Sequence, residues 1–330
     1  MDEVITDIEQ ATPEWLTRAL QKVGVLGRGE VTAVTIRPVD GHKMHASVHL
    51  DVSYSQDADG DKPQRLFLKL LDGLTSEAQF YKHVAPESGG LNLVFCYDAI
   101  YSDDRHWAHV LLEDVSATHH IPPEPPPYEQ LIDVLADFHA QWWAHPKLCD
   151  EVARVAWDPH ADVLAKALKG FPAFIDAMRD SLTNQQREIY EQVLAALPLP
   201  DWSQRVASGR QVTVAHGDAH PYNFLYPGVA GDGIYLIDWA IWHIDTGPSD
   251  IAYAVAMGHT GEDRARVEAA LLERYHRRLL KQGVADYDRE QCWLDYRMAV
   301  IAILPYTVFW QQLELPSEIW RSNMTCLLAA

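Results

Sequence analysis

Cysteine is scarce in this sequence, and no apolar run is long enough to span a membrane. The 330 residues contain four cysteines, which are far apart and form no C-x-x-C pair. This spacing argues against a zinc knuckle or a redox motif and favours four free, buried thiols. No apolar run reaches the roughly 18 residues of a membrane span, and the acidic first ten residues lack the pattern of a secretory signal. We therefore expect a cytoplasmic protein that binds no membrane.

Basic residues are also in the minority. The chain has 27 Lys and Arg against 47 Asp and Glu, and its formal net charge is −20. Binding to nucleic acid requires a Lys/Arg surface that replaces phosphate counterions, so this partner class is disfavoured. An acidic surface favours a cationic ligand only weakly, because net charge mainly sets solubility and long-range steering. The composition is otherwise that of an ordinary globular protein, and the length predicts two lobes.

The residues that appear placed for chemistry concentrate in one stretch, 212–252. An apolar run from Val212 to Ala215 predicts a strand, the polar segment from His216 to Asn223 a loop, and Ile234 to Ile237 a second strand that ends at Asp238. If the two strands are neighbours, three side chains meet at the mouth of the loop. These are Asp218, Asn223 and Asp238.

This acid and amide set suits magnesium and phosphoryl transfer. Mg²⁺ takes hard oxygen ligands, commonly one or two carboxylates together with substrate phosphates. Asn223 and Asp238 would supply such ligands, which leaves Asp218 to orient an attacking hydroxyl and accept its proton, as the catalytic-loop Asp of kinases does. His216, Gly217 and Asp218, followed by four residues and Asn223, also have the spacing of the kinase catalytic loop, with Gly in place of Arg.

The stretch resembles the aminoglycoside phosphotransferase and choline kinase-like small-molecule kinases, whose loop reads HGD-x-x-x-x-N and whose metal-binding Asp ends an I-D-[WF] strand. The resemblance implies a bilobal, protein kinase-like α+β fold with an antiparallel N-terminal sheet and a mainly helical C-terminal lobe. It implies ATP and Mg²⁺ as cofactors. The implied partner is a small-molecule hydroxyl acceptor, which could be an aminoglycoside, a macrolide, a sugar, an amino alcohol or a steroid-like alcohol.

Residues 1–115 are predicted to form the N-terminal, nucleotide-binding lobe. Two alternating strands around 31–36 and 47–52 flank a hairpin that carries only Gly41, in the place of a kinase glycine-rich loop. Lys69 interrupts the buried-type strand Leu66 to Leu71 and needs a partner. We expect that partner to be Glu77, early in a helix whose E-x-x-F-Y sequence again resembles the family, so that the pair holds nucleotide phosphates.

A proline-rich segment, 116–127, is predicted to be the hinge between the lobes. The strand before it ends in Leu-Leu-Glu-Asp-Val, which resembles the family's hinge and implies main-chain contacts of adenine with Glu113 and Val115. The C-terminal lobe, 128–330, begins with a clear amphipathic helix, Tyr128 to Trp143, and ends in two long helical patterns.

Further roles are assigned around the catalytic stretch. The resemblance implies that C-terminal helices wall the acceptor site, so we predict acceptor contacts from Trp242, His243, Asp245 and Tyr296. His216 and His220 are predicted to be structural. Asp250 is also predicted to be structural, by bonding the backbone amides at the start of the following helix.

Two alternatives remain open. His216, Asp218 and His220 could form the H-x-D-x-H motif of a metal-dependent hydrolase. Such a site would need further His or Asp ligands at a consistent spacing. His243, Asp245 and His259 lie downstream, but they do not form a closely spaced ligand pair in the sequence. The glycine-poor hairpin could instead belong to a pseudokinase that binds nucleotide without catalysis.

Overall fold

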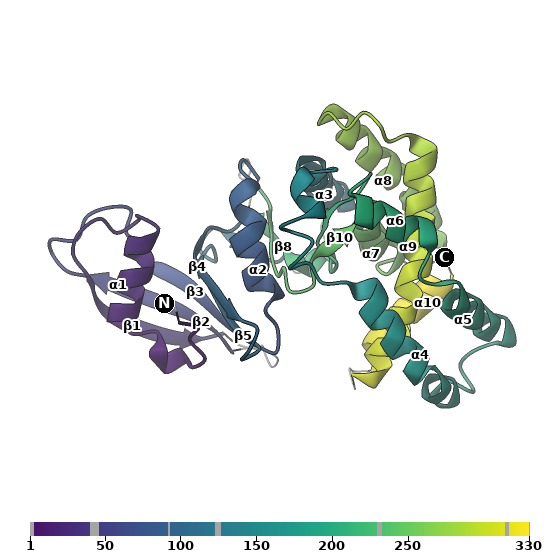
Figure 1. Ribbon diagram of the computed structural model, residues 1–330, viewed down its shortest axis with the longest axis horizontal. Helices are drawn as coiled ribbons and strands as arrows, with labels where there is room; N and C mark the ends of the chain where they lie inside the picture. The colour runs from purple at the N-terminus through teal and green to yellow at the C-terminus, as the bar shows by residue number, and fades with distance from the viewer. Residues whose placement is uncertain are drawn as a thin grey trace. The chain divides into compact units, whose positions relative to one another are not determined.

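The computed structural model describes residues 3–39, 46–91, 93–122, 127–229, 233–259, 261–313 and 317–329. The chain forms two compact units (Figure 1). The N-terminal unit comprises Met1–Pro122 and Phe224–Ala240, and the C-terminal unit comprises Pro123–Asn223 and Ile241–Ala330. The segment 224–240, which the sequence analysis placed with the C-terminal lobe, thus packs with the N-terminal unit.

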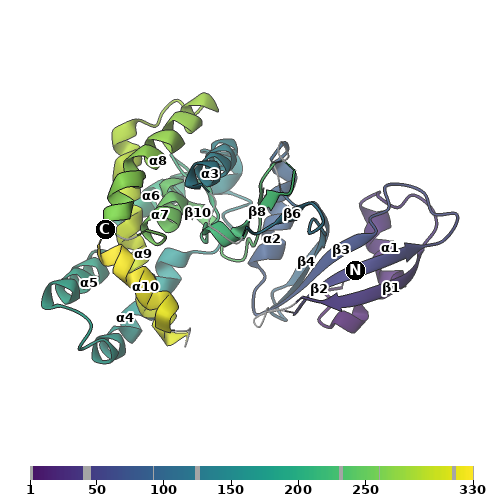
Figure 2. The ribbon, with the colours of Figure 1, turned by 180° about the vertical axis from the view of Figure 1, so that it is seen from behind.

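The N-terminal unit contains an antiparallel five-stranded sheet of order β1-β2-β3-β5-β4. Strands β1, β2, β3 and β4 of this sheet are labelled in Figure 2. Four of its strands, β1, β2, β3 and β5, confirm predicted strands, whereas β4 was not predicted. On β3, Leu66, Leu68 and Leu70 are buried on one face. The strands are β1 (Val31–Pro38), β2 (Ala46–Tyr54), β3 (Arg65–Asp72), β4 (Cys96–Ser102) and β5 (Trp107–Glu113).

Two helices cover this sheet. In α1 (Pro13–Lys22), Thr12 caps the helix by accepting from the Trp15 amide at 3.2 Å. Leu16 and Leu20 of α1 join the leucines of β2 and β3 in the core. The second helix, α2 (Ser76–His83), is the predicted helix with Glu77 in its first turn, and it packs on β4 and β5. Short 3-10 turns are η1 (Ile8–Gln10) and η2 (Ala85–Glu87).

Two small sheets correct the strand–loop–strand prediction. The strand that enters the catalytic loop, β7 (Thr213–Ala215), pairs with β10 (His243–Asp245) in the C-terminal unit. The strand before Asp238, β9 (Tyr235–Leu236), pairs instead with β8 (Phe224–Pro227), which pairs with β6 (His119–His120) in the N-terminal unit. The two predicted strands are therefore not neighbours, because β8 and β10 take their pairing edges.

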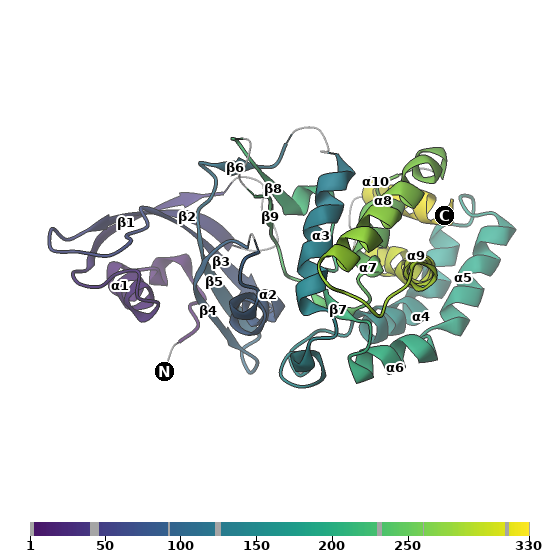
Figure 3. The same ribbon diagram turned by 90° about the horizontal axis from the view of Figure 1, so that it is seen from above.

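The C-terminal unit is mainly helical, as expected. Its helices α3, α7 and α8 pack side by side (Figure 3), and α9 packs on α4, α5, α7 and α10. The helices are α3 (Tyr128–Trp142), α4 (Pro159–Ala177), α5 (Asn184–Ala196), α6 (Pro200–Ser208), α7 (Pro248–Ala256), α8 (Gly261–Lys281), α9 (Arg289–Gln312) and α10 (Ser317–Leu328), with the 3-10 turns η3 (Pro146–Cys149) and η4 (Pro221–Asn223).

Helix α9 alone among the helices of the described chain is long and apolar enough for a membrane span, by length and composition. Its most apolar stretch is 61% buried, and residues such as Ala299, Leu304 and Val308 lie in the core. A core helix of a folded unit explains this composition without a membrane.

The cysteines only partly match the prediction. All four are free thiols, and Cys292 and Cys326 are buried, but Cys96 is half-buried and Cys149 is exposed. The prediction of four buried thiols is wrong for these two because Cys149 ends a surface 3-10 turn and Cys96 begins a strand near the sheet edge.

Candidate active site

Lys69 lies on the central strand β3 and makes two ion pairs within the N-terminal unit. Its Nζ is 2.6 Å from Glu77 Oε2 and 3.1 Å from Asp238 Oδ1. Burial alone would lower the pKa of Lys69, but the two carboxylates reverse this and raise it. The ammonium is therefore charged at neutral pH, and the predicted Lys69–Glu77 pairing is confirmed.

The turn after β9 is tied to α2. Glu77, in the first turn of α2, also accepts a hydrogen bond from the Trp239 backbone amide. The Trp239 indole stacks on Phe80, with ring centroids 3.8 Å apart and planes 7° from parallel. The Ser76 hydroxyl donates to the Ala240 carbonyl. These contacts hold Asp238 beside Lys69.

Asp238 itself has an uncommon backbone conformation. Its φ is +67°, in the left-handed region that few residues other than glycine adopt, although Asp is among those enriched there. Its side chain is 46% exposed, so its carboxylate can meet a ligand as well as Lys69. Strain of this kind recurs at functional sites.

The loop from His216 to Asn223 brings Asp218 and Asn223 together. Asn223 Nδ2 donates to the Asp218 carbonyl at 2.8 Å and to Asp218 Oδ2 at 3.2 Å. Because the amide nitrogen is engaged in this way, Asn223 Oδ1 is the atom that could ligate a cation. Gly217 is required in this loop, because its φ is +84° and a Cβ would lie 2.4 Å from the Ile241 carbonyl oxygen.

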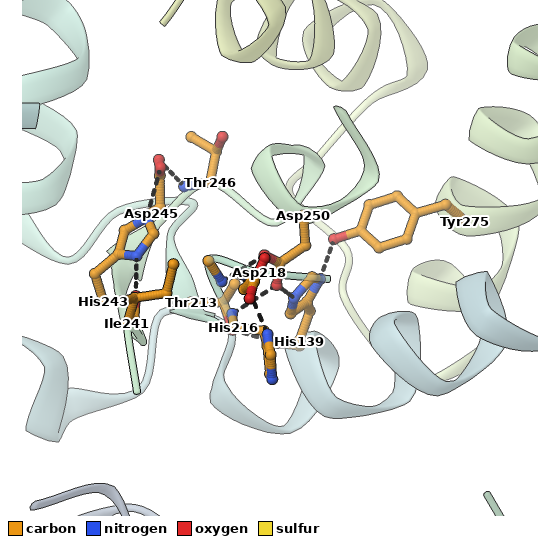
Figure 4. Close-up of polar contacts among 11 residues, drawn as sticks. His139, Thr213, His216, Asp218, Ile241, His243, Asp245, Thr246, Asp250 and Tyr275 are labelled. Atoms are coloured by element: carbon orange, nitrogen blue, oxygen red, sulfur yellow. Dashed lines mark hydrogen bonds and ion pairs between the residues drawn. The ribbon is translucent and has the colours of Figure 1, made fainter. Parts of the chain in front are cut away.

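A buried carboxylate, Asp250, supports this loop (Figure 4). It accepts from the backbone amides of His216 at 2.6 Å and Gly217 at 2.8 Å. It also bonds His139 Nε2 at 3.0 Å, and His139 Nδ1 bonds the Tyr275 hydroxyl at 2.9 Å. The prediction that Asp250 bonds amides at the start of its own helix is wrong, because its side chain points to the catalytic loop instead.

Asp218 is a carboxylate at neutral pH. Burial raises its pKa, but hydrogen bonds from His220 and Tyr253 and the nearby His216 outweigh burial and lower it overall. The Asp218 side chain is 27% exposed, so it can meet a substrate. His220 Nε2 lies 3.4 Å from Asp218 Oδ2, and His216 Nδ1 accepts from the Asp218 amide at 3.2 Å.

A second polar cluster lies in the same unit. The buried Asp245 contacts His160 Nε2 at 2.9 Å and His243 Nε2 at 3.3 Å, and His243 Nδ1 bonds the Ile241 carbonyl at 3.0 Å. Burial opposes the charge of Asp245, but the two imidazoles lower its pKa to about 2. Histidine and aspartate ligand atoms here all lie within 4.8 Å of one another.

Other predicted residues are distributed as follows. Trp242 is fully buried, and Tyr296 is buried with its hydroxyl donating to Glu268 on α8 at 3.2 Å. The Val115 carbonyl accepts from the Thr118 amide in a turn at 3.0 Å. Gly41 lies outside the described residues.

Three residues near the loop were not predicted from the sequence: Tyr253, His160 and His139. Their roles depend on contacts between segments that are distant in the chain. His160 and Asp245, for example, are 85 positions apart, so no local pattern indicates their contact. Tyr253 lies three residues after Asp250 on α7, and this spacing was the one sequence signal that places it on the same helix face as Asp250.

The donor atoms of Asn223 and Asp238 are chemically suited to magnesium. Asn223 in the C-terminal unit offers an amide oxygen and Asp238 in the N-terminal unit a carboxylate oxygen, and both are hard ligands of the kind that Mg²⁺ prefers. His216 is buried and its Nδ1 is bonded within the loop. The metal-capable His and Asp group found in the described part of the chain is His160, His243 and Asp245, not the H-x-D-x-H motif.

The chain is also similar to known proteins. A model of the phosphotransferase enzyme family (APH) matches residues 61–293. Among curated protein sequences, no significant match exists.

Solved structures with a similar fold are more numerous. A protein from Ralstonia eutropha JMP134, described as a putative aminoglycoside phosphotransferase, matches over 96% of this chain and 95% of its own, with 11% identity and a TM-score of 0.59. An ethanolamine kinase from Plasmodium vivax covers 91% and 82%, with 13% identity and a TM-score of 0.54. The GDP complex of aminoglycoside 2'-phosphotransferase-IIIa covers 96% of both chains, with 13% identity and a TM-score of 0.52. At these identities, the likeness establishes the protein kinase-like fold.

Proposed function

The chain belongs to the phosphotransferase enzyme family, and from this premise we propose that it is an ATP- and magnesium-dependent kinase that phosphorylates a hydroxyl of a small molecule. In this reaction the acceptor oxygen forms a bond to the γ-phosphorus, the bond from that phosphorus to the bridging oxygen breaks, and ADP leaves. The hydroxyl proton passes to Asp218. The observation that carries the proposal is the contact of Asn223 with the carboxylate of Asp218 on a loop braced by Asp250.

Lys69 is the residue that binds the phosphates of ATP. Its ammonium is charged and lies 2.6 Å from the carboxylate of Glu77, and the two residues lie on a central strand and the helix that follows it. Glu77 keeps the ammonium in place, so that little ordering remains to be done when the nucleotide binds. Asn223 Oδ1 and the Asp238 carboxylate would hold Mg²⁺, which would supply charge neutralisation at the phosphates.

Asp218 orients the acceptor hydroxyl and takes its proton. A carboxylate of lowered pKa is a weak base, so proton transfer follows the formation of the new P–O bond rather than preceding it. Most of the rate enhancement then comes from positioning and charge neutralisation, as phosphoryl transfer requires. His216 and His220 support the loop through contacts with Asp218 and are not assigned proton transfer.

The test is the Asp218→Asn variant, assayed for ADP release with Mg-ATP and a panel of aminoglycosides, macrolides, sugars, amino alcohols and sterols. Because a positioned base contributes about 10²- to 10⁴-fold, turnover of any accepted substrate should fall by that factor while ATP affinity is kept. The exposed Asp180→Asn variant is the matched control. Normal turnover by Asp218→Asn would contradict the mechanism, and nucleotide binding by the wild type with no acceptor in any screen would indicate a pseudokinase.

A further inference from the structure

A cavity of about 350 Å³ lies wholly within the C-terminal unit, among η3, α4, α6, β10 and α9. We name it the helical cavity. This volume is within the range of small-molecule sites, ~300–1,000 Å³. Its wall is mostly carbon, with the indoles of Trp157 and Trp202, the ring of Pro305 and the side chains of Val163, Leu164 and Ile244.

Charged groups are few in the helical cavity. No Lys, Arg or Glu lines it among the described residues, and its one carboxylate is that of Asp158. Asp158 Oδ1 caps α4 by accepting from the Ala161 amide at 3.0 Å. An ammonium group that loses its water here would lack the paired carboxylates that buried cations need. The lining therefore opposes a polycationic acceptor, although the net charge of the whole chain is −20.

A smaller cavity of about 20 Å³ borders the helical cavity and the catalytic loop. The two share His160, Trp202, Ala302 and Tyr306 in their linings, and the smaller one reaches Gly217 and Tyr253. Tyr253 is hydrogen-bonded to Asp218. Because one water needs roughly 10–15 Å³, the smaller cavity has room for one hydroxyl group and not for a ring.

The sizes and the chemistry of these two cavities fit one class of molecule. A hydrocarbon body fills the larger cavity, and a hydroxyl enters the smaller one, where imidazole and phenol groups can bond it. Resting on the proposed function, we propose that the acceptor is an uncharged alcohol with a bulky, largely hydrocarbon body, bound in the helical cavity with its hydroxyl directed towards Asp218.

The first experiment measures ADP release with matched sets of acceptors. Sterols, diterpene alcohols and polycyclic phenols form one set, and aminoglycosides, choline and hexoses form the other. We expect turnover of members of the first set only. If members of the second set are phosphorylated and none of the first, the inference is overturned while the kinase function stands.

The second experiment narrows the cavity. Ser203 is exposed and Ala156 is half-buried, and both line the cavity. S203W and A156W therefore place an indole in the cavity without replacing a buried core residue. Since one methylene in a hydrophobic pocket already changes specificity by ~10–200-fold, each variant should raise the KM for the alcohol by at least about 10-fold with a smaller effect on kcat. A173W, on the exposed face of α4, is the control and should leave KM unchanged. Unchanged KM in folded S203W and A156W, checked by thermal unfolding, would overturn the inference.

A binding measurement separates this inference from the catalytic one. Because two indoles line the cavity, the alcohols should change the intrinsic fluorescence of the wild-type chain, and S203W should weaken their binding. Binding of this kind without ADP release supports the cavity assignment and contradicts phosphoryl transfer. Absence of any fluorescence change with all alcohols of the first set contradicts the cavity assignment.

Discussion

Two buried carboxylates, Glu77 in the N-terminal unit and Asp250 in the C-terminal unit, support functional groups in different ways. Each is 1% exposed. Glu77 contacts a side-chain ammonium, that of Lys69 at 2.6 Å, and one backbone amide, that of Trp239. Asp250 instead accepts from two backbone amides of the catalytic loop and from His139. Glu77 therefore mainly places a charge, and Asp250 mainly shapes the loop. This difference predicts that loss of Glu77 acts mainly on nucleotide use and loss of Asp250 mainly on folding.

Asp250→Ala should have the largest effect. The substitution leaves the amides of His216 and Gly217 and the buried His139 without this acceptor, and each buried donor left unsatisfied costs about 1–3 kcal/mol of unfolding free energy. The exposed pair of Asp133 with Arg274 gives the control, since Asp133→Ala should cost no more than about 1 kcal/mol. Urea unfolding of both variants measures the difference. Equal losses of unfolding free energy in the two variants would mean that Asp250 does not stabilise the catalytic loop.

Glu77→Gln should have an intermediate effect, and on function rather than folding. Lys69 keeps its contact with Asp238, so the buried ammonium is not left alone. A hydrogen bond to a charged group contributes about 1.5–3 kcal/mol, so the KM for ATP should rise about 10- to 100-fold. ADP release at varied ATP concentration gives this value, and urea unfolding provides the comparison with Asp250→Ala. A destabilisation as large as that of Asp250→Ala, with an unchanged KM, would remove the contrast between the two carboxylates.

The sequence predicted the parts of the site that depend on short spacings. Asp218 and Asn223 lie on one loop, and Lys69 and Glu77 are eight positions apart, so strand and helix periodicity are enough to bring each pair together. Most helices and strands were predicted for the same reason, because burial alternates with the period of each element.

Contacts between distant segments were not predicted. Asp250 reaches the loop 33 positions earlier in the chain, and β7 pairs with β10 rather than with the strand before Asp238. The helical cavity combines segments from Leu148 to Tyr306. No local pattern encodes these contacts, since they follow from how helices pack and which strand edges remain available.

Tyr253→Phe should have the smallest effect, and it tests the catalytic loop while leaving the hydrogen bonds of Asp250 to the loop in place. The Tyr253 hydroxyl bonds the carboxylate of Asp218 and lowers the pKa of that group. Without the hydroxyl the pKa of Asp218 rises, a larger share of Asp218 is protonated at acidic pH, and the acid limb of kcat/KM moves to higher pH. At neutral pH the loss of kcat/KM should be about 10-fold or less.

Tyr222→Phe, which removes an exposed hydroxyl from the same loop, is the control and should leave the pH profile unchanged. A shifted profile in both variants, or in neither, would show that Tyr253 does not tune Asp218, whereas a shift in Tyr253→Phe alone, with unfolding unchanged, would separate tuning of the base from support of its backbone by Asp250.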